Sequence, residues 1–173
     1  RRSRGEASLL DVKIEITKRI LRSCRLCGRQ CGVDRLVGER GICGLGTEAV
    51  VAEHFVHIGE EPPINPSLDL FLVGCGLRCS YCNRKDLWDP DCPGEPLNAD
   101  FWKLLDTRGA RSMSFVGGNP DESLYAILRF LRCAPGDWAL SVVWNCNGYA
   151  MPDTVKLLEG VVDTFVPDAK FGN

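Results

Sequence analysis

Ten cysteines are the feature that most restricts how this chain of 173 residues folds. Seven of them fall into two groups: Cys24, Cys27, Cys31 and Cys43, and then Cys75, Cys79 and Cys82. Most neighbours within a group are two or three residues apart, a spacing that lets several thiolates hold one inorganic centre. Secreted disulfide domains instead spread their cysteines through a short chain. The pattern predicts metal chemistry in a reducing, cytoplasmic environment.

The amino-acid composition and net charge exclude several classes of function. Hydrophobic residues make up 45% and charged residues 25%, which is average for a globular protein. The net charge of −2 gives no argument for nucleic acid or membrane binding, and the apolar runs are no longer than strands. The start, Arg1 to Arg4, lacks the apolar run that would follow in an intact signal peptide, and we read it as a processed or cropped end.

Hydrophobic periodicity predicts an α/β fold. We expect a helix over 9–22, a cysteine-rich segment over 24–46 whose order depends on bound metal, and a strand over 49–58. Prolines at 62, 63 and 66 then mark a boundary between a cysteine-rich metal-binding subdomain, 1–66, and a second domain, 67–173. In the second domain we expect strands at 68–73, 112–116, 139–144 and 161–166, and helices at 98–105, 121–132 and 152–159.

Alternating strands and helices of this kind form a parallel sheet or part of a (βα) barrel. Each expected strand runs into a segment rich in cysteine, glycine or polar residues. Proteins of this class place their active sites at the carboxyl ends of the strands. We therefore expect the site at that edge of the sheet.

The loop Cys75-Gly-Leu-Arg-Cys79-Ser-Tyr-Cys82 is the most specific motif in the chain. Three thiolates on one loop ligate three irons of a [4Fe–4S] cubane and leave the fourth iron without a protein ligand. The alternative is a zinc site that a distant cysteine or histidine completes. The position directly after a strand and the aromatic Tyr81 favour the cluster.

The chain resembles the radical S-adenosylmethionine (SAM) superfamily, and within it the relatives of pyruvate formate-lyase-activating enzyme that carry an extra N-terminal cysteine motif. The resemblance rests on these segments: Cys24-Arg-Leu-Cys27, Gly38-Glu39-Arg40-Gly41-Ile42-Cys43, His57-Ile58-Gly59-Glu60-Glu61-Pro62, the three-cysteine loop, Phe115-Val116-Gly117-Gly118, Val143-Trp144-Asn145-Cys146-Asn147-Gly148 and Pro167-Asp168-Ala169-Lys170. It implies a six-unit (βα) barrel, of which this chain supplies about four units. A further segment or a partner would supply the rest.

The resemblance also implies a reaction. The cluster on Cys75, Cys79 and Cys82 cleaves SAM reductively, and the resulting 5′-deoxyadenosyl radical abstracts hydrogen. Electrons come from a donor such as flavodoxin or ferredoxin, and the substrate is a small molecule or a protein such as a glycyl-radical enzyme. The implied SAM contacts are Tyr81, Gly117, Gly118, Asn119, Asn145, Asn147, Asp168 and Lys170. Asn119 departs from the family, which has an acidic residue after the two glycines.

Several alternatives stay open on the sequence. The set Cys24, Cys27, Cys31 and Cys43 fits structural zinc or an auxiliary [4Fe–4S] cluster equally well by spacing. The missing units and Asn119 also fit a non-catalytic iron–sulfur or zinc subunit derived from such an enzyme. We expect His54 and His57 to be structural residues. A zinc-ribbon nucleic-acid module is disfavoured because there is no basic stripe with interleaved aromatics.

Overall fold

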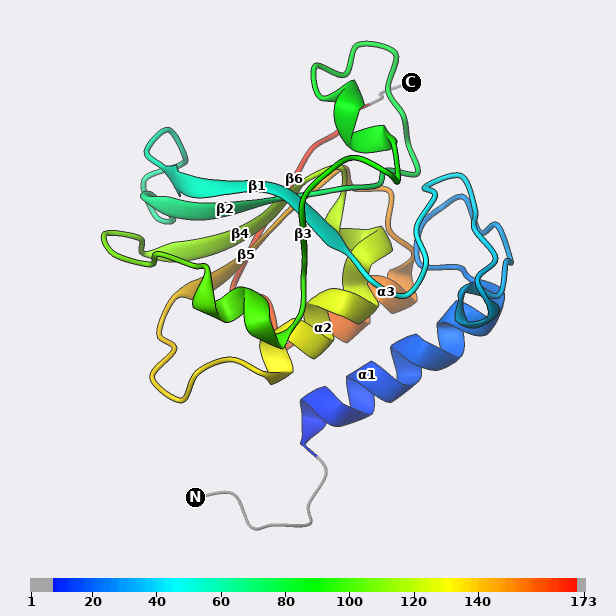
Figure 1. The fold of residues 1–173 in the computed structure, drawn as a ribbon, viewed down its shortest axis with the longest axis horizontal. Coiled ribbons are helices and arrows are strands. Elements are labelled where there is room, and N and C mark those ends of the chain that lie inside the picture. Colours follow the sequence, from blue (N-terminus) through cyan, green and yellow to red (C-terminus); the bar gives the residue numbers. More distant parts are fainter. Residues whose placement is uncertain (1–7, 171–173) are drawn as a thin grey trace.

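The computed structural model describes residues 8–170, so the segment Arg1 to Arg4 lies outside it. One six-stranded sheet organises the chain, in the order β3-β1-β2-β4-β5-β6 (Figure 1). The strands are β1 (Val50–His57), β2 (Ser67–Leu72), β3 (Glu95–Pro96), β4 (Ser112–Gly117), β5 (Ser141–Cys146) and β6 (Thr164–Pro167). The sheet is open, and the fold is a mixed α/β fold, as the sequence predicted.

Four strands of the sheet, β2, β4, β5 and β6, run parallel to one another. Crossovers through helical segments connect them, which is the βα rhythm expected from the sequence. β1 pairs antiparallel with β2, from Val51 opposite Leu72 to His57 opposite Ser67. Although β1 precedes the boundary expected at residue 66, it therefore shares a sheet with the segment that follows.

Three α-helices lie on one side of this sheet: α1 (Leu9–Ile20), α2 (Leu124–Arg132) and α3 (Pro152–Leu158) (Figure 1). Ser8 caps α1 through a capping box with Asp11, because each side chain bonds the other residue's backbone N–H. The segment expected to be helical at 98–105 forms a 3₁₀-helix over Ala99–Lys103, which the Asn98 side chain caps. No helix within residues 8–170 is long and apolar enough to cross a bilayer.

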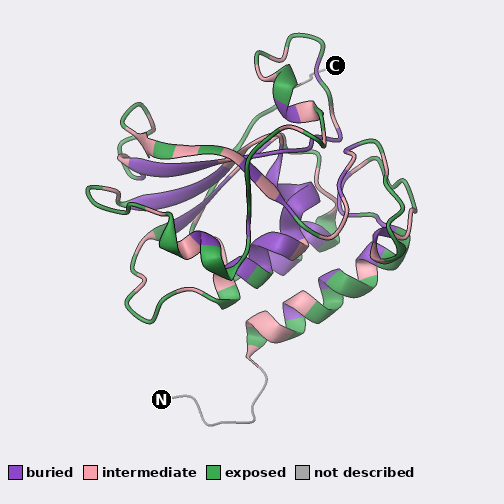
Figure 2. Ribbon diagram, in the orientation of Figure 1, coloured by how far each residue is buried: buried purple, intermediate pink, exposed green. Residues whose placement is uncertain are grey.

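The two faces of the sheet differ because alternate side chains of a strand point to opposite sides. On β2, Leu68, Leu70 and Leu72 are buried and belong to the apolar core that the helices cover (Figure 2). On the opposite face β2 carries Asp69 and Phe71, and the Phe71 ring lines a cavity. The helices thus occupy one face and leave the other for the candidate site.

Candidate metal centre

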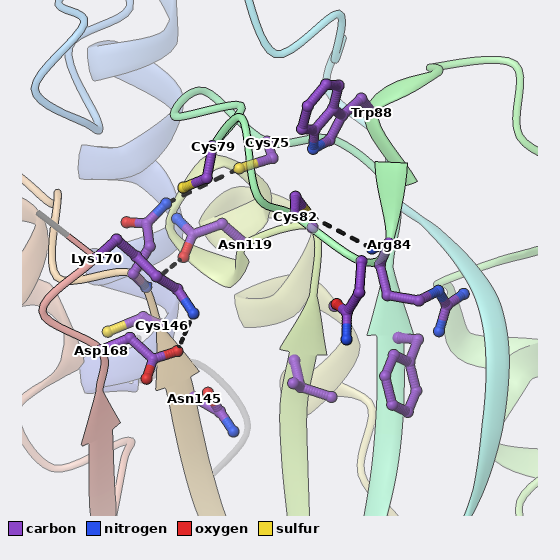
Figure 3. Close-up of a pocket in the computed structure, with 16 residues that line it drawn as sticks. Cys75, Cys79, Cys82, Arg84, Trp88, Asn119, Asn145, Cys146, Asp168 and Lys170 are labelled. Atoms are coloured by element: carbon purple, nitrogen blue, oxygen red, sulfur yellow. Dashed lines mark hydrogen bonds and ion pairs between the residues drawn. The ribbon is translucent and has the colours of Figure 1, made fainter. Parts of the chain in front are cut away.

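A cavity of about 260 Å³ lies at the carboxyl ends of the parallel strands. Its lining comes from the ends of β2, β4 and β5 and from the loops that follow all four parallel strands, as the strand-end pattern predicted (Figure 3). The lining includes these sequence-predicted residues: Cys75, Cys79, Cys82, Gly117, Gly118, Asn119, Asn145, Asn147, Asp168 and Lys170. Segments about 100 residues apart in the sequence therefore meet around one space.

The three-cysteine loop follows β2 and wraps around the Cys75 sulfur. Arg78 adopts the left-handed region with φ of 53°, which turns the backbone between Cys75 and Cys79. Burial raises the pKa of the Cys75 thiol, while backbone N–H groups of Leu77 and Arg78 lower it. Because metal ligation requires thiolates, these N–H donors stabilise the form that binds.

The third cysteine of the loop has donors and cations of its own. The backbone N–H of Arg84 points at the Cys82 sulfur at 3.4 Å. The Arg84 guanidinium lies 5.2 Å from the centre of the Phe71 ring and pairs with Glu53 and Asp86. The Arg84 guanidinium is therefore held beside the cavity by two carboxylates, which offset its positive charge.

Gly117 and Gly118 close the β4 end of the cavity. Gly117 has φ of 100°, and a Cβ there would lie 2.6 Å from the Leu72 nitrogen. A Cβ on Gly118 would lie 2.2 Å from the Gly74 carbonyl oxygen. Only residues without side chains let the end of β4 pack this closely on the segment that leads into the cysteine loop.

Asn119 joins three segments of the site. Its side-chain oxygen accepts the backbone N–H of Asn147 at 3.0 Å. Its amide nitrogen donates to Asp121 at 3.0 Å and to Glu122. All three of these acidic and amide side chains are buried. An acid at this position would have no N–H to offer the two carboxylates, which gives a physical reason for the departure seen in the sequence.

Glu122 connects this network to the cysteine loop. Its carboxylate accepts the backbone N–H of Gly76 at 2.8 Å, directly beside Cys75. Burial raises the pKa of Glu122 to about 7, and the hydrogen bond from Asn119 opposes that rise. Asp121 accepts the Trp144 indole N–H at 2.8 Å, and burial raises its pKa as well. Glu122 thus braces the cysteine loop, and Asp121 connects the same network to Trp144 of β5.

The end of β6 supplies the opposite wall of the cavity. Lys170 forms an ion pair with Asp168, and this hydrogen bond raises the pKa of Lys170. The Tyr81 hydroxyl donates to the Lys170 carbonyl, so the cysteine loop contacts the β6 end directly. Tyr81 itself lies outside the cavity lining, whereas Asn145 lies within it on β5. A cation at the rim is suited to an anionic ligand.

The first cysteine group abuts the cysteine loop. Arg29 donates to the Gly76 carbonyl at 2.8 Å, and a Cβ on Gly76 would lie 3.3 Å from the Cys27 sulfur. Buried Arg35 donates to the Glu122 carbonyl at 2.9 Å and lies 3.8 Å from the Cys24 sulfur. The two cysteine groups therefore form adjoining parts of one region.

Within the first group, Cys24, Cys27 and Cys43 are buried and Cys31 is exposed. Burial, followed by the charge of Glu122, raises the pKa of Cys27 to about 12. Tetrahedral zinc with Zn–S bonds of 2.3 Å holds its sulfurs about 3.8 Å apart. Among residues 8–170, only His57, Glu60 and Asp69 bring three such ligand atoms within 4.8 Å of one another. The same is true of the sulfurs of Cys75, Cys79 and Cys82, so this spacing does not separate zinc from a cluster at the first group.

Several residues of the region carried no signal in the sequence. They are Phe71, Trp88, Asp121, Glu122 and Arg35. In the sequence, Asp121 and Glu122 look like ordinary acidic residues in the first turn of a helix. Their position just after Gly117 and Gly118 is the one sequence feature that could have marked them as site residues. Their burial becomes apparent only in the structure, where the end of β4 packs on the segment that leads into the cysteine loop.

This arrangement defines a cysteine-rich α/β protein with its thiols gathered at the carboxyl edge of a parallel sheet. The chain belongs to the family described as the 4Fe-4S single cluster domain, whose model matches residues 67–168. Family membership indicates a [4Fe–4S] cluster. The matched range begins at β2, and so it does not include the first cysteine group.

A curated relative aligns with almost the whole chain, but its name gives no activity. The chain is 36% identical over 175 aligned residues to an uncharacterised protein of Methanocaldococcus jannaschii. The alignment covers 96% of this chain and 51% of the relative, so the chain spans about half the length of that protein. No solved structure gives a significant match.

Proposed function

We propose that the chain is the cluster-bearing part of a radical SAM enzyme, in which Cys75, Cys79 and Cys82 hold a [4Fe–4S] cluster. One observation carries the proposal. The cavity that the three cysteines line is also lined by Gly117, Gly118 and Lys170, from two other strand ends. A closed electron-transfer cluster has no need for such a shared space, whereas a cluster with an open iron needs room for a ligand.

The donor set fits the cluster. Cys75 and Cys79 are buried, and Cys82 is half-buried at the mouth of the cavity. Three thiolates, with no fourth protein thiolate from the same loop, match a cubane with one open iron. When bound, the cluster supplies one electron that breaks the sulfonium C–S bond of SAM, giving methionine and a 5′-deoxyadenosyl radical.

The protein's own residues bind and orient the ligand in this proposal. Backbone groups of Gly117 and Gly118, which line the cavity at the end of β4, receive the SAM amino group. The Lys170 ammonium pairs with the SAM carboxylate, and its ion pair with Asp168 keeps it charged. Asn145 and Asn147 offer amide donors and acceptors for the remaining polar groups of the ligand.

The proposal extends to metals and partners. The first cysteine group would hold a second metal centre, zinc or an auxiliary cluster, and its contact with Gly76 would stiffen the cysteine loop. The reductant is an external one-electron donor such as flavodoxin or ferredoxin. The substrate from which hydrogen is taken is a protein, of the glycyl-radical type, or a small molecule that enters beside the β6 end.

A product assay tests the proposal. The anaerobically reconstituted protein, reduced with dithionite and given SAM, is expected to form 5′-deoxyadenosine and methionine, measured by chromatography. Cys82→Ala removes a cluster ligand and should abolish the product. Cys133→Ala alters an exposed thiol at the end of α2 and should leave the product unchanged. No 5′-deoxyadenosine from iron-loaded protein would contradict the proposal and favour a non-catalytic iron–sulfur subunit.

A further inference from the structure

A second cluster of ligand-type side chains lies far from the cysteines, on the same face of the sheet as the cavity. His57 Nδ1 is 2.9 Å from Glu60 Oε1 and 3.5 Å from Asp69 Oδ2. His57 ends β1, Glu60 lies in the turn that follows, and Asp69 is in the middle of β2. One imidazole nitrogen and two carboxylates thus converge at the start of the parallel sheet, opposite the cysteine loop.

One oxygen of Asp69 has no hydrogen bond of normal geometry. The Asp69 side chain is 3% exposed, and no donor in the described part of the chain bonds its Oδ1, although the Ser67 hydroxyl lies near enough to this carboxyl to lower its pKa. Four buried side-chain oxygens within residues 8–170 lack such a partner, and Asp69 Oδ1 is the one that belongs to the ligand cluster. Leaving a buried polar group unsatisfied costs about 1–3 kcal/mol, so this oxygen is suited to an additional partner.

We propose that His57, Glu60 and Asp69 bind a divalent transition-metal cation, distinct from the iron–sulfur chemistry of the cysteines. Two carboxylates balance the charge of such an ion, and imidazole with carboxylate is a ligand set that first-row divalent metals accept. The unpartnered oxygen of Asp69 would gain a cation in place of the missing donor.

The site would remain open to an external ligand. The His57 side chain is 42% exposed, in contrast to the buried Asp69. Three protein ligands with exchangeable positions are typical of metal sites where a further ligand binds directly, whereas structural sites are closed by four. The inference does not depend on SAM cleavage, because neither the cysteines nor the cavity residues take part. It revises our expectation that His57 is purely structural.

Mn²⁺ is the probe that separates this site from the cysteines, because hard Mn²⁺ prefers oxygen and nitrogen ligands over thiolates. Mn²⁺ is titrated into the protein, and the free ion is followed by its six-line electron paramagnetic resonance signal. We expect one saturable site per chain. Asp69→Asn and Glu60→Gln should each weaken its affinity at least about tenfold, the range seen when metal-site groups are altered.

Glu61→Gln is the matched control, because Glu61 is adjacent to Glu60 in the chain but exposed. It should bind Mn²⁺ as tightly as the unchanged protein does. If Asp69→Asn fails to fold, Glu60→Gln decides the question, since Glu60 lies in a turn. Absence of saturable binding to the unchanged protein would overturn the proposal, as would equal affinity in Glu60→Gln and Glu61→Gln.

Discussion

Replacing Asn119 with aspartate tests the network that braces the cysteine loop. The substitution introduces the acid that the resemblance to radical SAM enzymes implies after the two glycines, yet here it should destabilise the protein. The Asn119 amide donates to the Asp121 and Glu122 carboxylates, and aspartate has no N–H to replace those two bonds. It would also place a third carboxylate among groups that are all at most 2% exposed.

The size of the effect follows from these contacts. A hydrogen bond to a charged group contributes roughly 1.5–3 kcal/mol, and two are lost. Protonation of one carboxyl relieves part of the repulsion, so the net loss of unfolding free energy should be about 3–5 kcal/mol, as for broken buried charge pairs. For a chain of this length that corresponds to a fall in Tm of about 10 °C.

The loss should depend on pH in a defined direction. Burial and neighbouring charges raise the folded-state pKa of the introduced carboxyl above its unfolded value of about 3.9. The folded state then binds more protons than the unfolded state, so the variant loses stability as pH rises through this range. Thermal unfolding at pH 5.5 and pH 8.0 should therefore show a larger difference from the unchanged protein at pH 8.0.

Asn98→Asp supplies the matched control. Asn98 uses its side-chain oxygen to accept the N–H groups of Asp100 and Phe101, a role that aspartate fills equally well at a helix N-cap. Its Tm should change by no more than about 2 °C. If N119D melts within that margin of the unchanged protein at pH 8.0, or if N98D loses as much as N119D, the reasoning is refuted.

Two further substitutions test the cavity. Gly118→Ala would force a Cβ to within 2.2 Å of the Gly74 carbonyl oxygen. We expect it to lower the iron bound per chain and to reduce the free energy of unfolding by about 1–3 kcal/mol. Gly136→Ala has open space around it and should change neither quantity, so equal iron contents in the two variants would contradict the packing argument. Lys170→Met should weaken SAM binding about 10- to 100-fold in calorimetry, because one charge-assisted contact is lost. Lys156→Met is the control, because it breaks an exposed lysine–aspartate ion pair with Asp153 and should leave SAM affinity unchanged. Equal SAM affinities in the two variants would exclude Lys170 from the SAM site.

The sheet was predictable from the sequence because its buried strands are short apolar runs that end in glycine or polar residues. The ends of two strands were misplaced. The predicted strand at 139–144 is β5 at 141–146, because Asn145 and Cys146 pair with Val166 and Pro167 of β6 in spite of their polarity. The predicted strand at 161–166 begins only at Thr164, since the backbone N–H groups of residues 161 and 162 both bond the carbonyl of Leu158 and close α3.

The sequence predicted the site residues that belong to recognisable motifs. It did not predict those that reach the site only through tertiary packing. Cysteine spacing, the position after a strand and Tyr81 identified the cysteine loop. The family resemblance together with the strand-end rule placed Gly117, Gly118 and Lys170 beside it. Sequence spacing is local, so it carried no information on how Glu122 bonds Gly76 or how Arg35 reaches the Glu122 carbonyl. The sequence also presented Asn119 as a lost charge, and only its two carboxylate partners explain the amide.

The central claim is that three cysteines hold a cluster whose open iron faces a ligand cavity. Electron paramagnetic resonance of the reduced protein, recorded with and without SAM, tests it most directly. We expect a [4Fe–4S]⁺ signal whose g-values shift when SAM is added, with the shift lost in Cys82→Ala and retained in Cys133→Ala. A signal of full intensity that does not change with saturating SAM would rule out an open iron that binds SAM.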